Sequence, residues 1–155
     1  MKIIRFLADD IVQYGILEDE NIRILREDPY HQFELSDIRY RLKKVKLLSP
    51  CVPSKIVALG LNYHSHAEEV NLRLPEVPLI FIKPASAAIG PEDSIVYPPS
   101  TNQVDYEGEL AVVIKKHAWK VPVENVEEYV LGYTCLNDVT ARDLQSKDRQ
   151  WTRSK

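Results

Sequence analysis

Short apolar runs dominate this sequence, and acidic pairs or prolines interrupt most of them before a helix of ordinary length can form. Runs of about four to eight apolar or alternating residues between turn residues favour strands. In the first 50 residues the expected strands cover residues 2–7, 11–17 and 21–26. Acidic residues at 9–10 and 18–20 are the expected turns between them. The sequence therefore predicts that the chain begins with a small β-rich unit.

Two prolines mark the expected end of this unit. The segment Ser49-Pro50-Cys51-Val52-Pro53 follows a charged stretch over residues 36–46. Each proline fixes its own backbone and restricts the residue before it, so regular structure is expected to stop there. We predict an N-terminal domain over residues 1–52 and a second domain over residues 53–155.

The second domain is predicted to be mixed α/β, with strands outnumbering helices. Ser65 is the expected N-cap of a short helix that reaches Val70. Pro122 is expected to open a second helix that runs to about Tyr129, with Gly132 ending it. Apolar runs bounded by Pro, Gly and Asn predict strands over residues 56–59, 79–82, 94–97, 110–115 and 133–136.

The charge balance argues against several classes of partner. Twenty Lys and Arg residues face 23 Asp and Glu residues, and the net charge of −3 is spread without a long run of one sign. This pattern favours neither nucleic acid nor an anionic membrane surface as a partner. Cys51 and Cys135 do not make a disulfide framework, and no apolar run approaches the roughly 20 residues of a membrane helix. We therefore expect a cytoplasmic protein.

Two glutamates lead directly into an apolar run at residues 105–114. Because residues i and i+2 of a strand share a face, Glu107 and Glu109 are expected to point the same way. Like charges side by side repel each other unless a cation lies between them. Asp138 ends another apolar run and would supply a third carboxylate. Hard oxygen ligands of this kind suit Mg²⁺ or Mn²⁺.

Two alternatives to a metal site stay open on these residues. The glutamates could mark an exposed strand end whose acids face water. Asp138 could be the N-cap of a turn that begins at Val139 or Thr140. Spacing alone does not choose between these readings and a metal site.

A histidine and an acid lie three residues apart shortly after the first strand of the second domain. A helical turn would place His66 and Glu69 on one face, within reach of a hydrogen bond. A carboxylate beside an imidazole orients the ring and raises its basicity, which a general base requires. The alternative is a surface contact. His64 and His66 also form an HxH pair, which in another context suggests zinc or iron.

Several cations and polar groups could hold the carboxylate of a substrate. Lys83 follows an expected buried strand, and Arg142 and Gln145 share one face of a turn. Charged hydrogen bonds from such groups suit a carboxylate. The alternative is that all three are ordinary surface residues.

Taken together and in order, five segments resemble the fumarylacetoacetate hydrolase family. The resemblance spans about residues 54–155 and implies a fumarylacetoacetase-like, β-rich catalytic domain. The segments are Gly60-Leu61-Asn62-Tyr63 with His66-Ala67-Glu68-Glu69, residues 78–84, residues 106–114, Asn137-Asp138-Val139-Thr140-Ala141-Arg142-Asp143, and Trp151-Thr152-Arg153-Ser154-Lys155.

The resemblance also implies roles for individual residues. It implies a Mg²⁺ or Mn²⁺ ion bound by Glu107, Glu109 and Asp138. The catalytic histidine and its acidic partner of the family fall on His66 and Glu69. Lys83 and Lys155 match lysines that orient the substrate, Lys155 within the catalytic set. Arg142 and Gln145 match positions near the substrate pocket.

The implied chemistry is that of a metal-dependent enzyme acting on 2-oxo or 1,3-dioxo acids through an enolate. Attack by activated water gives C–C hydrolysis of an acylpyruvate, loss of CO₂ gives decarboxylation, and proton transfer gives isomerisation of a 2-hydroxyhepta-2,4-diene-1,7-dioate type acid. A dehydratase of a sugar-derived 2-keto acid is a further alternative. The expected partners are the small 2-oxo acid and a second copy in a homodimer.

Members of the family continue well beyond the position of Lys155. We therefore expect the catalytic domain to be incomplete in this chain. A non-catalytic metal-binding or ligand-binding fragment that lacks the C-terminal half is the alternative from a different functional class.

Overall fold

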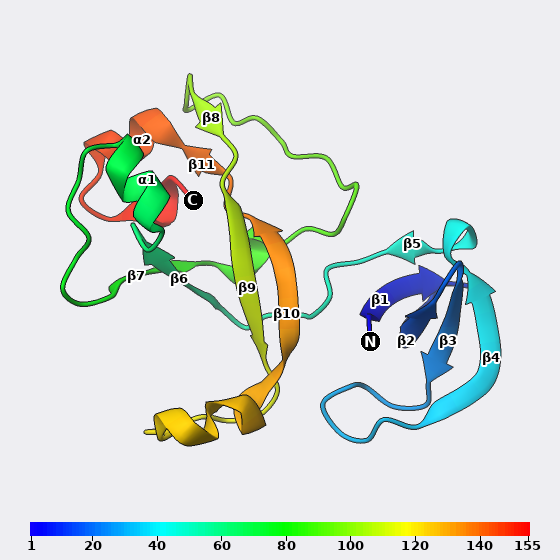
Figure 1. The fold of residues 1–155 in the computed structure, drawn as a ribbon. Coiled ribbons are helices and arrows are strands. Elements are labelled where there is room, and N and C mark those ends of the chain that lie inside the picture. The colour runs from blue at the N-terminus through cyan, green and yellow to red at the C-terminus, as the bar shows by residue number, and fades with distance from the viewer. The chain divides into compact units, whose positions relative to one another are not determined.

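Short strands are the commonest element in the computed structural model, which describes all of residues 1–155 (Figure 1). The strand-dominated α/β class predicted from the sequence is confirmed. The residues group into two units, the first with Met1–Val52, Ile89–Ser94 and Gly108–Leu136, and the second with Pro53–Ala88, Ile95–Glu107 and Asn137–Lys155. None of the helices is both long and apolar enough to cross a membrane.

The first unit contains an antiparallel five-stranded sheet in the order β4-β3-β2-β1-β5. Three strands match the predicted runs and two were missed, because β4 and β5 lie in the charged stretch before the prolines. Their backbones complete the sheet although their side chains are mostly polar. The strands are β1 (Ile3–Ala8), β2 (Ile11–Glu18), β3 (Asn21–Leu25), β4 (Leu35–Arg41) and β5 (Lys46–Leu47).

One face of this sheet carries the hydrophobic core of the first unit. Phe6 and Ile22 are fully buried, and Ala8 and Ile24 pack with them. Gly15 packs directly against this core, because a Cβ atom there would lie only 2.5 Å from the Ile22 side chain. The predicted turns are confirmed at Asp9, Asp10 and Asp19, which have φ values of 50°, 60° and 54°. Aspartate is one of the residues that tolerate this left-handed conformation.

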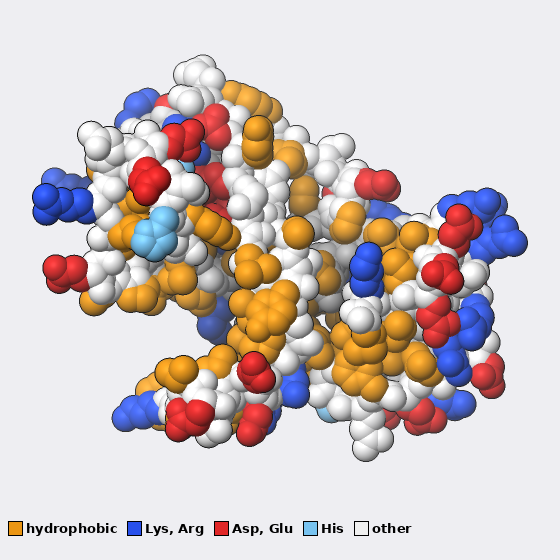
Figure 2. Space-filling view, in the orientation of Figure 1, with side chains coloured by type: hydrophobic (Ala, Val, Ile, Leu, Met, Phe, Trp, Pro, Cys, Tyr) orange, Lys and Arg blue, Asp and Glu red, His pale blue; other side chains and the backbone are white.

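A second pair of strands in the first unit consists of β9 (Gly108–Ile114) and β10 (Val130–Asn137), which share a two-stranded sheet. The expected helix after Pro122 is instead a 3-10 helix, η3 (Val123–Tyr129). Gly132 does not end that helix, because it lies inside β10. Leu110, Val112 and Ile114 of β9 are exposed, and Figure 2 shows hydrophobic side chains at the surface near this strand. The homodimer stays a prediction.

The second unit combines two short sheets with two short helices. The pair β6 (Ile56–Gly60) and β7 (Leu79–Lys83) is antiparallel, and so is the pair β8 (Val104–Asp105) and β11 (Thr140–Ala141). The helices are α1 (His64–Glu69) and α2 (Arg142–Lys147), with single 3-10 turns at η2 (Ala85–Ala87) and η4 (Trp151–Arg153). A further 3-10 turn, η1 (Leu42–Lys44), belongs to the first unit.

Two further local expectations in the second domain are wrong. Ser65 is not the N-cap, because α1 begins at His64 and the preceding Tyr63 makes no side-chain cap. Residues 94–97 form no strand, since the prolines that follow them restrict strand pairing. The alternative role of Asp138, as only the N-cap of a turn at Val139 or Thr140, finds no support, because both of its side-chain oxygens pair with lysines.

Candidate active site

The 3-10 turn η4 brings Lys155 to the centre of the second unit. The Trp151 ring packs edge-on against Phe81 of β7, with ring centroids 5.4 Å apart. Gly60 of β6 allows this approach, because a Cβ atom there would lie 2.5 Å from Trp151 Cζ3. The Thr152 hydroxyl donates a hydrogen bond of 2.8 Å to the carbonyl of Ile82. These contacts fix η4 on the β6–β7 sheet.

The next residues connect η4 to β11. The backbone N–H of Ala141 donates to the carbonyl of Ser154 at 2.7 Å, and the Ser154 hydroxyl donates to Trp151 O at 2.7 Å. The Lys155 ammonium lies 5.0 Å from the centroid of the Phe81 ring, a cation–π contact. Lys155 is thus held by backbone and ring contacts.

Backbone hydrogen bonds place Glu107 beside Asp138. The N–H of Asp138 donates to the carbonyl of Glu107 at 2.8 Å. The N–H of Glu107 donates in turn to the side-chain Oδ1 of Asn137 at 3.0 Å. Two carboxylates 31 positions apart in the sequence are therefore neighbours in the fold.

The carboxylates of Glu107 and Asp138 share one ammonium group. Lys155 Nζ lies 2.6 Å from Glu107 Oε2 and 2.8 Å from Asp138 Oδ2. Lys83 Nζ pairs with the other oxygen of Asp138. The side chains of Lys83, Asp138 and Lys155 are only 7%, 5% and 3% exposed. Buried charges persist only when paired in this way.

Arg142 extends the ionic cluster to a third acid. Its Nη2 donates to Glu107 Oε1 at 2.7 Å, its Nε to Asp105 Oδ2 at 2.9 Å and its Nη1 to Gln145 Oε1 at 2.7 Å. Three cations, Lys83, Arg142 and Lys155, thus face three acids, Asp105, Glu107 and Asp138. We call these six residues the ionic cluster.

Electrostatics keep Glu107 ionised. Burial alone would raise the pKa of its carboxyl, but the Lys155 ammonium and the Arg142 guanidinium outweigh burial and hold that pKa below its ordinary value. Burial has the opposite effect on Arg142, whose pKa it lowers, but hydrogen bonds to Asp105 and Glu107 outweigh burial and raise that pKa above its ordinary value. Both groups are therefore charged at neutral pH.

His66 and Glu69 form the contact expected from their spacing. His66 Nδ1 lies 3.3 Å from Glu69 Oε2 on α1. Both side chains are well exposed, at 50% and 77%. The catalytic role of the pair stays a prediction.

The donor chemistry of the cluster fits a hard divalent cation, because Glu107 and Asp138 direct ionised oxygens at one shared positive group. No group of three or more His, Cys, Asp or Glu side chains is arranged to hold a metal ion. Glu109, the third predicted ligand, lies in β9 of the first unit, on the same face as the half-buried Ala111 and Val113. A common ion for the three carboxylates stays a prediction.

Sequence reasoning assigned no role to Asp105, although this residue lies two positions before Glu107. Its part in the cluster depends on a guanidinium 37 positions away. The one sequence feature that pointed to Asp105 was its position two residues before Glu107, a spacing that would have suggested a shared site for the two acids.

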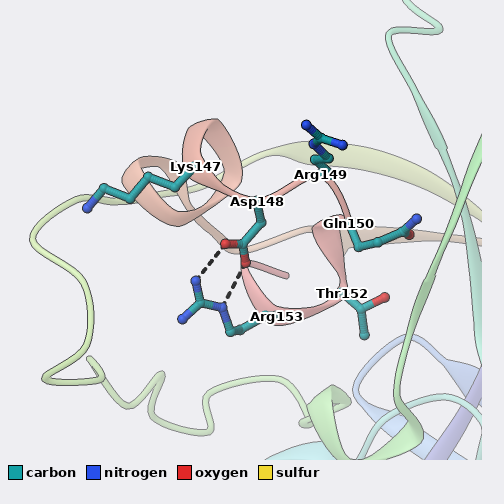
Figure 3. A pocket seen from close by; sticks show the side chains of 6 residues that line it. All are labelled: Lys147, Asp148, Arg149, Gln150, Thr152 and Arg153. Carbon is teal, nitrogen blue, oxygen red and sulfur yellow. Dashed lines mark hydrogen bonds and ion pairs between the residues drawn. The ribbon is translucent and has the colours of Figure 1, made fainter.

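A surface pocket of about 650 Å³ lies beside η4 (Figure 3). Its charged lining includes a two-contact ion pair between Arg153 and Asp148, with N–O distances of 2.7 and 2.6 Å. No residue of the ionic cluster lines this pocket. We place the candidate site at the cluster, because the buried paired charges lie there. The pocket is lined by Lys147, Asp148, Arg149, Gln150, Thr152 and Arg153.

Comparison with known proteins assigns the family. Residues 55–155 match the model described as fumarylacetoacetate (FAA) hydrolase C-terminal. The chain belongs to the fumarylacetoacetate hydrolase family. Residues 1–50 match a second model, described as Rv2993c-like, N-terminal. The predicted resemblance is therefore confirmed.

Members of this family with related sequences carry several activities in their names. A 5-carboxymethyl-2-hydroxymuconate delta-isomerase structure from Mycobacterium smegmatis matches with TM-score 0.90 at 38% identity, over 100% of this chain and 61% of that chain. A maleylpyruvate hydrolase from Sphingobium sp., solved with manganese(II) and pyruvate, matches with TM-score 0.69 at 28% identity, over 92% and 60%. The mitochondrial oxaloacetate tautomerase of Rattus norvegicus is 44% identical over 110 residues, 70% of this chain and 35% of the relative.

The family member described here spans about half the length of the curated relatives that it matches. The share is 46%, 51% and 61% for three of them.

Proposed function

We propose that this protein is a metal-dependent enzyme that acts on small 2-oxo or 1,3-dioxo acids. The observation that carries the proposal is the pair of ionised carboxylates, Glu107 and Asp138, that share one buried cation. The isomerase, hydrolase and tautomerase relatives support it, because each named reaction can proceed through the enol or enolate of a carbonyl acid.

Glu107, Glu109 and Asp138 are the proposed ligands of Mg²⁺ or Mn²⁺. When bound, the cation would act as a Lewis acid on the 2-oxo group of the substrate. Glu109 enters the proposal as the acid two positions after Glu107, although Glu107 lies between β8 and β9 and not in the strand that was predicted to align the two side chains. The manganese(II) of the maleylpyruvate hydrolase relative supports this choice of ion.

Lys83 and Lys155 are the proposed partners of the substrate's carboxylate. Both ammonium groups lie beside Asp138 in a nearly water-free environment. Charge-assisted hydrogen bonds are strong there, because little solvent screens them. The lysines would therefore orient an acid in the site.

His66 is the proposed proton carrier, with Glu69 as its orienting partner. The contact at Nδ1 leaves Nε2 to exchange a proton. Taking a proton from water gives C–C hydrolysis, whereas moving one from carbon gives isomerisation or tautomerisation. Decarboxylation requires no attacking water, so it depends less on this residue.

Turnover by the full-length protein tests the proposal. An acylpyruvate, oxaloacetate and a hydroxydienoate should be tried with Mg²⁺, with Mn²⁺ and after chelation. We expect activity that chelation abolishes and Mg²⁺ restores. His66→Ala should lower kcat for hydrolysis or isomerisation roughly 10²–10⁴-fold with KM little changed.

The matched control is His31→Ala. His31 pairs with Asp28 at the same i, i+3 spacing and at 3.4 Å, but in the first unit. Its removal should leave turnover unchanged. Full activity in the presence of chelator, or no conversion of any 2-oxo acid with metal present, would contradict the proposed function.

A further inference from the structure

We propose that Asp105 is a positioning residue for the metal site and that it acts through Arg142 on the carboxylate of Glu107. The proposal rests on the proposed function, since Glu107 is there a ligand of the divalent cation. It adds a residue for which neither the sequence nor the family resemblance gave a role.

The short β8–β11 sheet sets the position of Asp105. Asp105 pairs with Thr140 in this sheet, and Val104 pairs with Ala141. The N–H of Arg142 donates to the carbonyl of Gln103 at 2.8 Å, which continues the pairing by one step. The side chains of Asp105 and Arg142 therefore start from neighbouring, hydrogen-bonded backbones.

The guanidinium of Arg142 is held on three sides. Nε is bound by Asp105 at 2.9 Å, Nη1 by Gln145 at 2.7 Å and Nη2 by Glu107 at 2.7 Å. These bonds use three of the five N–H groups of the side chain. A planar group fixed at three points has little rotational freedom left, so its contact with Glu107 has a defined direction.

This contact orients the carboxylate of Glu107. Its Oε1 accepts a hydrogen bond from Arg142, and its Oε2 pairs at 2.6 Å with the Lys155 ammonium that Asp138 shares. Partners of this kind commonly fix the orientation of a metal-binding carboxylate. Arg142 therefore fixes the orientation of the carboxylate that would help to hold a divalent cation.

A guanidinium so close to a metal ligand has an electrostatic cost, because like charges repel. Asp105 offsets that cost. Its carboxylate lies against Nε of Arg142, on a different nitrogen from the one that binds Glu107, whereas Gln145 is neutral. The geometry thus gives Asp105 two effects through Arg142, which are to orient Glu107 and to reduce repulsion of the cation.

A substrate-binding role for Arg142 predicts a different result. If the guanidinium served only to hold the substrate's carboxylate, changes at Asp105 would raise KM and leave metal affinity unchanged. A positioning role predicts weaker metal binding before any substrate is present. Metal affinity without substrate therefore separates the two roles.

The experiment is titration of the metal-free, full-length protein with Mn²⁺ by calorimetry and electron paramagnetic resonance, without substrate. Asp105→Asn should weaken Mn²⁺ binding by roughly tenfold to hundredfold. The matched control is Asp148→Asn, which removes a carboxylate from another guanidinium pair, at Arg153, outside the ionic cluster (Figure 3). Its Mn²⁺ affinity should equal that of the unaltered protein.

A double variant shows whether Asp105 acts through Arg142. In an Arg142→Gln background, Asp105→Asn should cause no further loss, because the group that it positions is absent. Asp105→Glu, which keeps the charge, should retain more affinity than Asp105→Asn. Circular dichroism at the titration temperature verifies that each variant is folded. If Asp105→Asn does not fold, the titration is carried out with Asp105→Glu instead.

Three results would overturn the inference. Unaltered Mn²⁺ affinity in folded Asp105→Asn would remove the positioning role while leaving the proposed function in place. An equal loss in the Arg142→Gln background would show that Asp105 does not act through Arg142. No Mn²⁺ binding by the unaltered protein would refute the proposed function and the inference together.

Discussion

Lys83 illustrates how far a single buried charge depends on its partner. The Lys83 and Asp138 side chains are almost completely removed from water and pair with each other. Lys83→Met keeps most of the apolar length of the side chain but removes its charged ammonium group. We expect a loss of about 3 kcal/mol in the free energy of unfolding, at the lower end of the range for a broken buried pair, because Lys155 still pairs with Asp138.

Urea unfolding of the metal-free protein measures this loss. Lys46→Met is the control, because Lys46 pairs with Asp93 through a side chain that is 59% exposed. Its removal should cost much less than the loss of Lys83, because water screens an exposed pair. Equal effects of the two substitutions would contradict the burial argument.

At the residue scale, the sequence predicted which side chains to group but not how they interact. Glu107, Asp138, Lys83, Arg142, Gln145 and Lys155 were all singled out, and the structure brings them together. That Lys155 bridges two acids depends on the docking of η4, which no local pattern reveals. Asp105 escaped notice for the same reason.

At the element scale, the packing of η4 on the β6–β7 sheet decides where Lys155 lies. Gly60→Ala would place a Cβ atom 2.5 Å from Trp151 Cζ3. The ring is held by Phe81, so it cannot move aside without losing that contact. We expect a loss of about 1–3 kcal/mol in unfolding free energy, as for other overpacked sites.

The matched control is Gly132→Ala in β10, where an added Cβ atom meets nothing within 4 Å. It should be neutral or slightly stabilising. Thermal unfolding measures both variants. The fluorescence of Trp151 in Gly60→Ala should also shift toward that of an exposed indole. An unchanged melting temperature and spectrum for Gly60→Ala would contradict the packing described here.

Strands were predicted correctly where apolar side chains form the pattern. They were missed where only backbone pairing with a neighbouring strand defines them. The runs that became β1, β2, β3, β6, β7, β9 and β10 are all apolar or alternating. In contrast, β4 is an edge strand of largely polar residues, defined by its pairing with β3. Residues 94–97 have a strand-like composition but no strand to pair with.

At the scale of the whole molecule, the strand-dominated fold followed from the short apolar runs, and the family followed from the order of the motifs. The substrate did not, because the proposed hydrolysis, decarboxylation, isomerisation and tautomerisation would all use the same charged groups. The homodimer stays a prediction that rests on the family resemblance.

We propose that Glu107, Glu109 and Asp138 bind one divalent cation. A crystal structure of the full-length protein with Mg²⁺, repeated with Mn²⁺ to obtain an anomalous signal, tests it most directly. We expect a single ion bound by an oxygen of each carboxylate, with distances of roughly 2.1 Å for Mg²⁺. A carboxylate of Glu109 turned away from the other two, or an ion bound elsewhere while Lys155 still bridges Glu107 and Asp138, would contradict it.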